Sequence, residues 1–483
     1  MTGCTSFSAR GTVAVAAILV LALGCSKPPD TKPKSDSPST VAGLPLTDGP
    51  SGPREGVPPA HLDVVNATGG EADVLMINSI ADVQEYWRTE YPKLFHEDLV
   101  PVTHFESYDS TQPTAIVCGG DAAGDPNAYY ASECEKGTDG IAWDRGKLIP
   151  DLIKNISVIS PLVVLAHEYG HAVQHKSLLT NSSTVSLVLE QQADCFAGAF
   201  MRSVAEGKSE HFTLNTTDGL SQAMAAIMAV RTPPEYARMN VGEMEHGPGI
   251  DRVSAFQMGF TDGPSACTKI DLDEIQRRRG DLPQVFADLK DSGELPVTEK
   301  SVGDVIDSLN TFFKLSQPPK ISYAGADQHC PDGKATPPVS YCPATNSIGI
   351  DMAGLTALGK VVQTDEMFDP VATGDFGAYV LLASRYALAA QKQAGEPLEG
   401  DNAARRNTCF VGAWATGLAE GTAGPKLVLS PGDPDEALSG LLTDGLVASD
   451  VNGVTLRSGF DRADAFRYGL AKGLAECRTH YSG

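Results

Sequence analysis

The feature that most constrains the fold of this chain is an internal repeat. Residues 249–267 align without gaps onto residues 459–477, and both segments end in cysteine. Further upstream, residues 165–174 have a counterpart in residues 382–391, and the segments follow one another in the same order in both halves. A chance likeness between helices rarely gives an ungapped match of this length, so we expect an internal duplication.

The repeat also predicts the domain boundaries. We expect a first copy over residues 61–270, a connector over 271–300 and a second copy over 301–483. The chain has 483 residues, of which 42% are hydrophobic, and it can therefore bury one large or two medium-sized cores.

Strand patterns precede the long helical patterns in the first copy. Residues 80–94 have helical apolar spacing, and short runs typical of strands follow at 115–118, 128–131 and 140–143. Helical patterns dominate from residue 162 onward. A small sheet followed by helices predicts the α+β fold class.

Comparison of the two copies distinguishes residues that the fold needs from residues that an activity needs. Residues shared by both copies are most simply explained by packing, whereas polar residues lost from one copy indicate a lost activity. Five polar residues of the first copy are lost together, and their counterparts in the second copy are Ser384, Arg385, Leu388, Ala404 and Thr408. We therefore expect the chemistry to reside in the first copy alone.

The five lost residues have the spacing of a metal site. His167-Glu168-x-x-His171 lies in a helical pattern, where positions i and i+4 share one face, so both imidazoles can reach one metal ion. Glu190 on the next helical pattern is the expected third ligand, and Asp194 is expected to orient His167 or His171. The opposite assignment, with Asp194 as the ligand, stays open. The alternative to a metal site is an ordinary amphipathic helix with polar histidines.

These motifs resemble the neutral zinc metallopeptidases of bacteria. The resemblance rests on His-Glu-Tyr-Gly-His-Ala-Val-Gln at 167–174 and Leu-Glu-Gln-Gln-Ala-Asp-Cys-Phe-Ala-Gly at 189–198, and it extends over roughly residues 70–270. It implies a gluzincin-like zinc metalloendopeptidase domain, followed here by a degenerate second copy without metal ligands. Ala172 departs from the pattern, because many relatives carry a further histidine there.

The resemblance also implies roles for individual residues. His167, His171 and Glu190 would bind Zn²⁺, and Glu168 would be the general base for a zinc-activated water that hydrolyses a peptide bond. The hairpin at 128–143 would pair with the peptide substrate.

Two other histidines have candidate roles in the same site. His246 faces Leu456 in the second copy and is thus lost with the ligands. We expect it to stabilise the oxyanion of peptide hydrolysis, with a surface position or a helix-capping role as the alternatives. His175, one turn past His171, is expected to lie near the site or on the surface and not to bind the metal.

The cysteines predict a disulfide framework. Ten cysteines occur, of which Cys4 and Cys25 lie at the N-terminus, and no Cys-x-x-Cys pair is present. Symmetry between the copies, and not spacing, predicts the pairs Cys118–Cys134, Cys195–Cys267, Cys330–Cys342 and Cys409–Cys477. A buried, unpaired Cys195 is the alternative for that residue.

The N-terminus predicts export. Arg10 precedes the apolar run Val13–Leu23, which is typical of a signal peptide over residues 1–24. Ala-Leu-Gly-Cys at 22–25 resembles a bacterial lipobox and implies a lipid on Cys25, which would anchor the protein to the outer face of the bacterial cytoplasmic membrane. A plain secretory signal is the alternative. Residues 25–60 are rich in proline and predict an extended tether.

Composition limits the partners. The net charge of −24 argues against nucleic-acid binding, which needs clustered Lys and Arg. We expect a peptide or protein substrate in the cell envelope and membrane attachment through Cys25. The alternative function is that of a non-catalytic envelope binding or assembly lipoprotein with a structural zinc site.

Overall fold

The computed structural model describes residues 40–135, 137–232, 246–284, 286, 293–327, 329–362 and 368–482. The predicted signal peptide, Cys25 and the first part of the predicted tether lie outside these residues. Within them helices predominate and the strands form small sheets, which confirms the α+β class. None of the helices described is both long and apolar enough to span a bilayer.

The first half, residues 40–284, contains a small sheet and a group of helices. Its strands are β1 (Thr40–Val41), β2 (Leu44–Pro45), β3 (Gly52–Pro53), β4 (His104–Tyr108), β5 (Ile116–Val117), β6 (Gly120–Asp121), β7 (Ala128–Glu135), β8 (Thr138–Asp144) and β9 (Phe212–Thr213). Its helices are α1 (Glu71–Phe95), α2 (Leu148–Asn155), α3 (Ser160–Lys176), α4 (Ser186–Ala205), α5 (Asp218–Ala229), α6 (Gly249–Asp262), α7 (Pro264–Cys267) and α8 (Leu272–Arg279).

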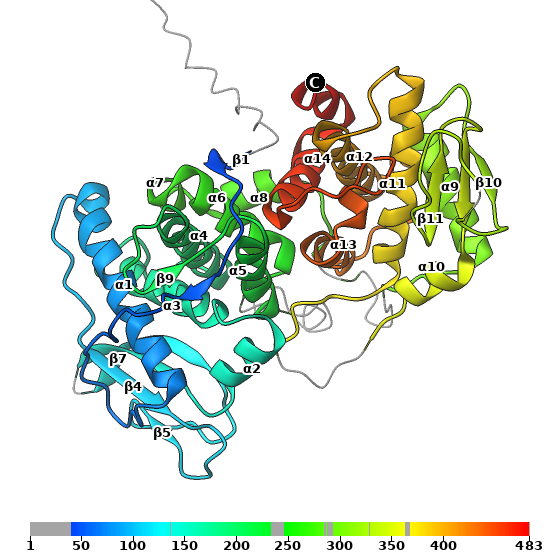
Figure 1. The fold of residues 1–483 in the computed structure, drawn as a ribbon. Helices are drawn as coiled ribbons and strands as arrows, with labels where there is room; N and C mark the ends of the chain where they lie inside the picture. Colours follow the sequence, from blue (N-terminus) through cyan, green and yellow to red (C-terminus); the bar gives the residue numbers. More distant parts are fainter. Residues whose placement is uncertain are drawn as a thin grey trace, which may run out of the picture. The chain divides into compact units, whose positions relative to one another are not determined.

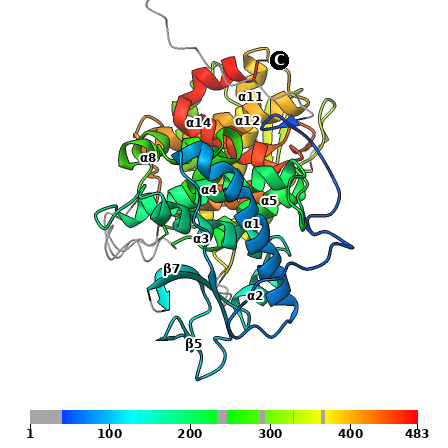
Figure 2. The same cartoon turned by 90° about the vertical axis from the view of Figure 1, so that its left-hand side faces the viewer.

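The main sheet of the first half has the order β4-β8-β7. Strand β4 runs parallel to β8 and β7 runs antiparallel to it, so β7 is an edge strand. Helix α3 packs against both α4 and β7. Figures 1 and 2 show β7 on the α3 side of the sheet, with β5 farther from that helix. Helix α4 and the edge strand β7 therefore both contact α3.

Residues 40–60 pack against the rest of the first half and do not extend from it. Gly52 pairs with Thr213 across the β3–β9 ladder, and the Asn215 amide donates to Ser51 Oγ at 2.9 Å. The prediction of a tether through residue 60 is therefore wrong for residues 40–60. Proline disfavours helices and central strands, but it permits short edge pairings of this kind.

The second half, residues 293–482, has a second small sheet and a second set of helices. Its strands are β10 (Lys320–Ser322), β11 (Val339–Cys342) and β12 (Ser347–Ile350). Its helices are α9 (Glu299–Phe313), α10 (Met352–Leu358), α11 (Asp375–Gln393), α12 (Asp401–Ala419), α13 (Asp433–Leu442), the short 3₁₀ helix η3 (Leu446–Ala448) and α14 (Gly459–His480). Its sheet has the order β10-β12-β11, with β10 parallel and β11 antiparallel to β12.

Glycines occupy corresponding positions in the two halves. Gly263 separates α6 from α7 at a φ of 77°, and Gly473 interrupts α14 at a φ of 76°. An L side chain is strained at such a φ, so the same break requires glycine in both halves. Gly198 and Gly259 lie against the backbone where α4 crosses α6, and Gly412 and Gly469 do so where α12 crosses α14. The close crossing of these helix pairs depends on the missing side chains.

All four predicted disulfides are present. Cys118 pairs with Cys134, Cys195 with Cys267, Cys330 with Cys342 and Cys409 with Cys477. The Cys195–Cys267 bridge ties α4 to α7, and the Cys409–Cys477 bridge ties α12 to the end of α14. The alternative of a buried, unpaired Cys195 is wrong.

The predicted connector is partly helical. Residues 272–279 form α8, and two of its arginines bind α6: Arg279 pairs with Asp251, and Arg278 Nη1 donates to the Asp251 carbonyl at 3.0 Å. These contacts fix α8 to α6.

A group of buried acids at the start of α11 and α13 predicts a pH dependence of stability. Burial, and then Glu294, raises the pKa of Asp375 to about 7 and that of Glu436 to about 8. Between the ordinary carboxyl pKa of an unfolded chain, about 4, and these raised values, the folded state binds more protons than the unfolded state. This contribution to stability is complete below about pH 4 and is lost as the pH rises through 7 to 8.

We therefore expect Glu436→Gln to flatten the fall in stability between pH 5 and pH 8.5. The natural protein loses free energy of unfolding between pH 5 and pH 8.5, and in the variant this loss should be smaller by on the order of 1 kcal/mol. Thermal unfolding of the variant at both pH values, beside the exposed control Glu55→Gln, measures the effect. Parallel pH curves for the three proteins would contradict it.

Candidate metal centre

Helix α3 carries two histidines into the interior between α3 and α4. Pro161 lies in its first turn, where a missing N–H costs nothing, and nearly all of its residues are buried. Gly170 lies against α4, and a Cβ there would be 2.9 Å from Ala193 Cα. Only glycine therefore permits this approach, which brings His167 and His171 toward Glu190 on α4.

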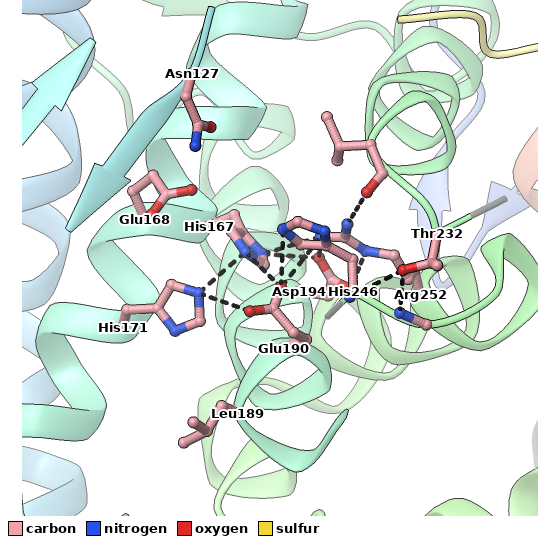
Figure 3. Close-up of polar contacts among 12 residues, drawn as sticks. Asn127, His167, Glu168, His171, Leu189, Glu190, Asp194, Thr232, His246 and Arg252 are labelled. Atoms are coloured by element: carbon pink, nitrogen blue, oxygen red, sulfur yellow. Dashed lines mark hydrogen bonds and ion pairs between the residues drawn. The ribbon is translucent and has the colours of Figure 1, made fainter. Parts of the chain in front are cut away.

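The three predicted ligands come together. His167 Nε2 and His171 Nε2 are 3.2 Å apart, and they lie 3.2 and 3.5 Å from the carboxylate oxygens of Glu190. One ligand atom from each residue lies within 4.8 Å of the other two. Figure 3 shows both histidines pointing toward Glu190.

The chemistry of this group fits a divalent metal ion. Two imidazole nitrogens and one carboxylate are a ligand set that zinc takes in hydrolytic sites. Glu190 Oε2 is buried, and the carboxylate oxygens of Glu190 face the Nε2 atoms of the two histidines. With the histidines neutral, as metal ligands are, and the three carboxylates of Glu168, Glu190 and Asp194 ionised, the buried guanidinium of Arg252 leaves two negative charges for a divalent cation to balance.

Asp194 lies behind His167 and not among the ligand atoms. Its Oδ1 accepts a hydrogen bond from His167 Nδ1 at 2.8 Å, which leaves Nε2 free to face the metal position. Arg252 binds both oxygens of Asp194, through Nε at 2.8 Å and Nη2 at 2.7 Å. The structure thus has Glu190 in the ligand position and Asp194 in the orienting position.

The carboxylates control the protonation of the histidines. Desolvation lowers the pKa of His167, but Asp194 and then Glu190 outweigh it and raise that pKa to about 10. Desolvation raises the pKa of Asp194, yet Arg252 and His167 hold it below its ordinary value. A metal ion at this site would displace protons from the histidines, so its affinity depends on pH.

His171 is oriented by a glutamine. Its Nδ1 donates to Gln174 Oε1 at 2.9 Å, while Gln174 Nε2 donates to the Leu189 carbonyl at 2.7 Å and to Gln192 Oε1 at 3.0 Å. Gln174 therefore links the second histidine to the turn of α4 that carries Glu190. We expect it to hold both ligands in place.

Replacing Gln174 by alanine should weaken metal binding about tenfold, the lower end of the loss typical for partners of metal ligands. The second half provides a matched control, because Gln391 occupies the corresponding position, is equally buried and accepts from Arg406 Nε at 2.9 Å. Competition with a chelator measures the dissociation constants. Equal affinities of the Gln174→Ala and Gln391→Ala variants would contradict a role for Gln174 at the metal.

Glu168 joins α3 to the sheet edge. The Tyr130 amide of β7 donates to Glu168 Oε2 at 3.0 Å, and the side chain is 9% exposed. Desolvation raises the pKa of this carboxyl group above its ordinary value. Asn127, which immediately precedes β7, points its amide toward the same space in Figure 3. A buried carboxylate, an edge strand and an amide thus border the metal position.

His246 lies at the border of the site. Its Nε2 is 3.9 Å from Glu190 Oε2, its side chain is 44% exposed, and its backbone amide donates to Thr232 Oγ1 at 3.1 Å. Desolvation and then the charge of Arg252 lower its pKa, so the ring is neutral at neutral pH. The structure therefore brings His246 near the cluster. His175 instead lies beside the Tyr130 ring and outside the ligand group.

Two residues of the site were not identified from the sequence. Arg252 and Gln174 have identical counterparts in the second half, Arg462 and Gln391. Agreement between the copies had favoured a packing role for them. No local signal marks either residue, because the contact of Arg252 with Asp194 depends on how α6 packs against α4.

The corresponding place in the second half contains no such ligand group among its described residues. Arg385, the counterpart of Glu168, is fully buried and donates to the Val339 carbonyl of β11 at 3.1 Å and to Ser449 Oγ at 3.0 Å. The guanidinium thus fills the space next to the strand. The remaining candidate clusters, His104–Glu106–Cys134 and Cys330–Asp332–Cys342, both include disulfide-bonded cysteines.

Comparisons of the chain with protein-family models, with curated proteins and with solved structures find no match.

Proposed function

We propose that this protein is a zinc metallopeptidase that hydrolyses peptide bonds, and that its active site lies in the first half of the chain. The observation that carries the proposal is the ligand group His167, His171 and Glu190, with Glu168 buried beside it and bonded to an edge strand. This combination supports hydrolysis better than a purely structural metal site, because a structural site needs no buried carboxylate next to its ligands.

The residues have separate roles in this proposal. His167, His171 and Glu190 would hold the zinc ion, which would lower the pKa of a water molecule and polarise the scissile carbonyl group. Glu168 would accept a proton from the attacking water and pass it to the leaving amine. Asp194 and Gln174 hold His167 and His171 in the orientation that binding requires. His246 donates a hydrogen bond to the oxyanion from the open side of the site.

Strand β7 is the candidate surface for the substrate. As an edge strand it presents backbone groups that can pair with an extended peptide, and it begins beside Asn127 and Glu168. A peptide on this strand would lie along α3 and over the metal position. An unstructured peptide or protein of the cell envelope is therefore the substrate class that we propose.

We also propose that the second half is a degenerate copy of a gluzincin-like domain. The two sheets share strand order and direction, and the disulfides and helix-breaking glycines correspond. For the N-terminus, which the described residues do not include, we propose a signal peptide over residues 1–24 and a lipid on Cys25. These assignments would locate the enzyme on the outer face of the cytoplasmic membrane.

Hydrolysis of an unfolded protein tests the function. The purified protein is assayed as isolated, after chelation and after addition of Zn²⁺. We expect activity to be lost on chelation and restored by zinc. A protein that binds zinc stoichiometrically and cleaves none of a set of unstructured proteins would refute the proposed activity.

A further inference from the structure

The first turn of α6 is capped by a carboxylate from the second half. The Gly249 amide donates to Asp435 Oδ2 at 2.8 Å, and the Ile250 amide donates to Asp435 Oδ1 at 2.7 Å. The first N–H groups of a helix have no partner within the helix, and the helix dipole favours a negative charge there. Asp435 belongs to α13, is 1% exposed and satisfies two of these groups at once.

Helix α6 carries a residue that holds the metal site together. Arg252 lies in the first turn, next to the capped amides, and is fully buried. It binds Asp194 with two hydrogen bonds, and Asp194 orients His167. A chain of direct contacts therefore runs from Asp435 in the second half to a metal ligand in the first.

A second contact leads from Asp435 to His246. Arg231 Nε lies 3.8 Å from Asp435 Oδ2, and Arg231 precedes Thr232, whose hydroxyl accepts the His246 amide. Arg231 Nη1 also donates to the Asp369 carbonyl of the second half at 2.9 Å. The start of α6 and the residue pair Arg231-Thr232, which holds His246, are thus both in contact with the second half.

The first half makes a corresponding contact with a helix of the second half, where no candidate metal ligands lie among the described residues. Ser221 of α5, in the first half, accepts the Gly459 amide at 3.0 Å at the start of α14. The two halves therefore cap each other's helix at corresponding positions. Helix α14 carries Arg462 in place of Arg252, but the second half has lost the ligands. One of two similar contacts thus reaches a functional site, and that one is made by an aspartate.

We propose that Asp435 is a positioning residue for the metal site, through which the second half, itself without ligands, sets the orientation of α6. This inference rests on the proposed metal site and not on peptidase activity. It gives the second half a role, because a first half without α13 would have an uncapped, mobile α6 and a displaced Arg252.

The test compares Asp435→Ala, Asp435→Asn and Ser221→Ala in the complete protein, with Co²⁺ as the probe. We expect Asp435→Ala to raise the Co²⁺ dissociation constant about tenfold and to change the visible spectrum of bound Co²⁺. Asp435→Asn keeps one acceptor and should give a smaller rise. Ser221→Ala removes the matched contact and should lower thermal stability without changing affinity or spectrum.

Two results would overturn the inference. One is an unchanged Co²⁺ affinity and spectrum in both Asp435 variants, and the other is an equal loss of affinity in Ser221→Ala. If Asp435→Ala does not fold, Asp435→Asn decides by the same criteria. Because the readout is metal binding, the inference survives a failure to cleave peptides, and the proposed activity survives a failure of the Asp435 variants.

Discussion

Replacement of Glu168 by glutamine is expected to reduce peptide hydrolysis about 10³-fold while the protein keeps its metal. Glutamine has the same shape as glutamate, and its amide oxygen can still accept the Tyr130 hydrogen bond. It cannot accept the proton of the attacking water, however. The three proposed ligands are unchanged, so zinc content and thermal stability should stay close to those of the natural protein.

The measurement is a rate of hydrolysis for each protein at equal zinc content. A variant that folds, binds zinc and cleaves within tenfold of the natural rate would exclude Glu168 as the general base. Loss of zinc together with activity would instead assign Glu168 a role in metal binding.

Replacement of His171 by alanine is expected to abolish both metal binding and hydrolysis. His171 supplies one of only two imidazole nitrogens in the ligand group. We expect the zinc dissociation constant to rise by more than about 100-fold, beyond the loss typical for residues that merely orient a ligand. Because His171 is partly exposed, the fold should tolerate the smaller side chain.

His175→Ala is the matched control for this prediction. His175 lies one turn later on α3 and contacts the Tyr130 ring, outside the ligand group. It should bind zinc as the natural protein does. Equal zinc affinities of the His171 and His175 variants, measured by competition with a chelator, would contradict the proposed ligand set.

The residues of the candidate metal site were predictable because their signal is local. His167, Glu168 and His171 lie within one helical segment, and alignment of the two halves of the sequence indicated that Glu190 and Asp194 belong with them. The same alignment predicted the disulfide pairing. Each of these predictions compares short segments of sequence and needs no knowledge of how helices cross.

The contacts that support the site were not predictable in this way. Arg252 reaches Asp194 over 58 positions of sequence, and Asp435 reaches Gly249 over 186. Such pairs depend on the packing of α4, α6 and α13, which no local pattern specifies. The prediction of a tether over residues 40–60 was wrong for a similar reason, because the structure of this segment comes from pairing with β9 and not from its own composition.

The coordination of bound zinc is the decisive test of the proposed catalytic site. X-ray absorption or anomalous diffraction of the zinc-loaded protein would identify the ligands. The proposal predicts two histidine nitrogens, from His167 and His171, a carboxylate oxygen from Glu190 and one position open to water. A fourth protein ligand, such as His246, would close that position and favour a structural zinc site in a non-catalytic envelope protein.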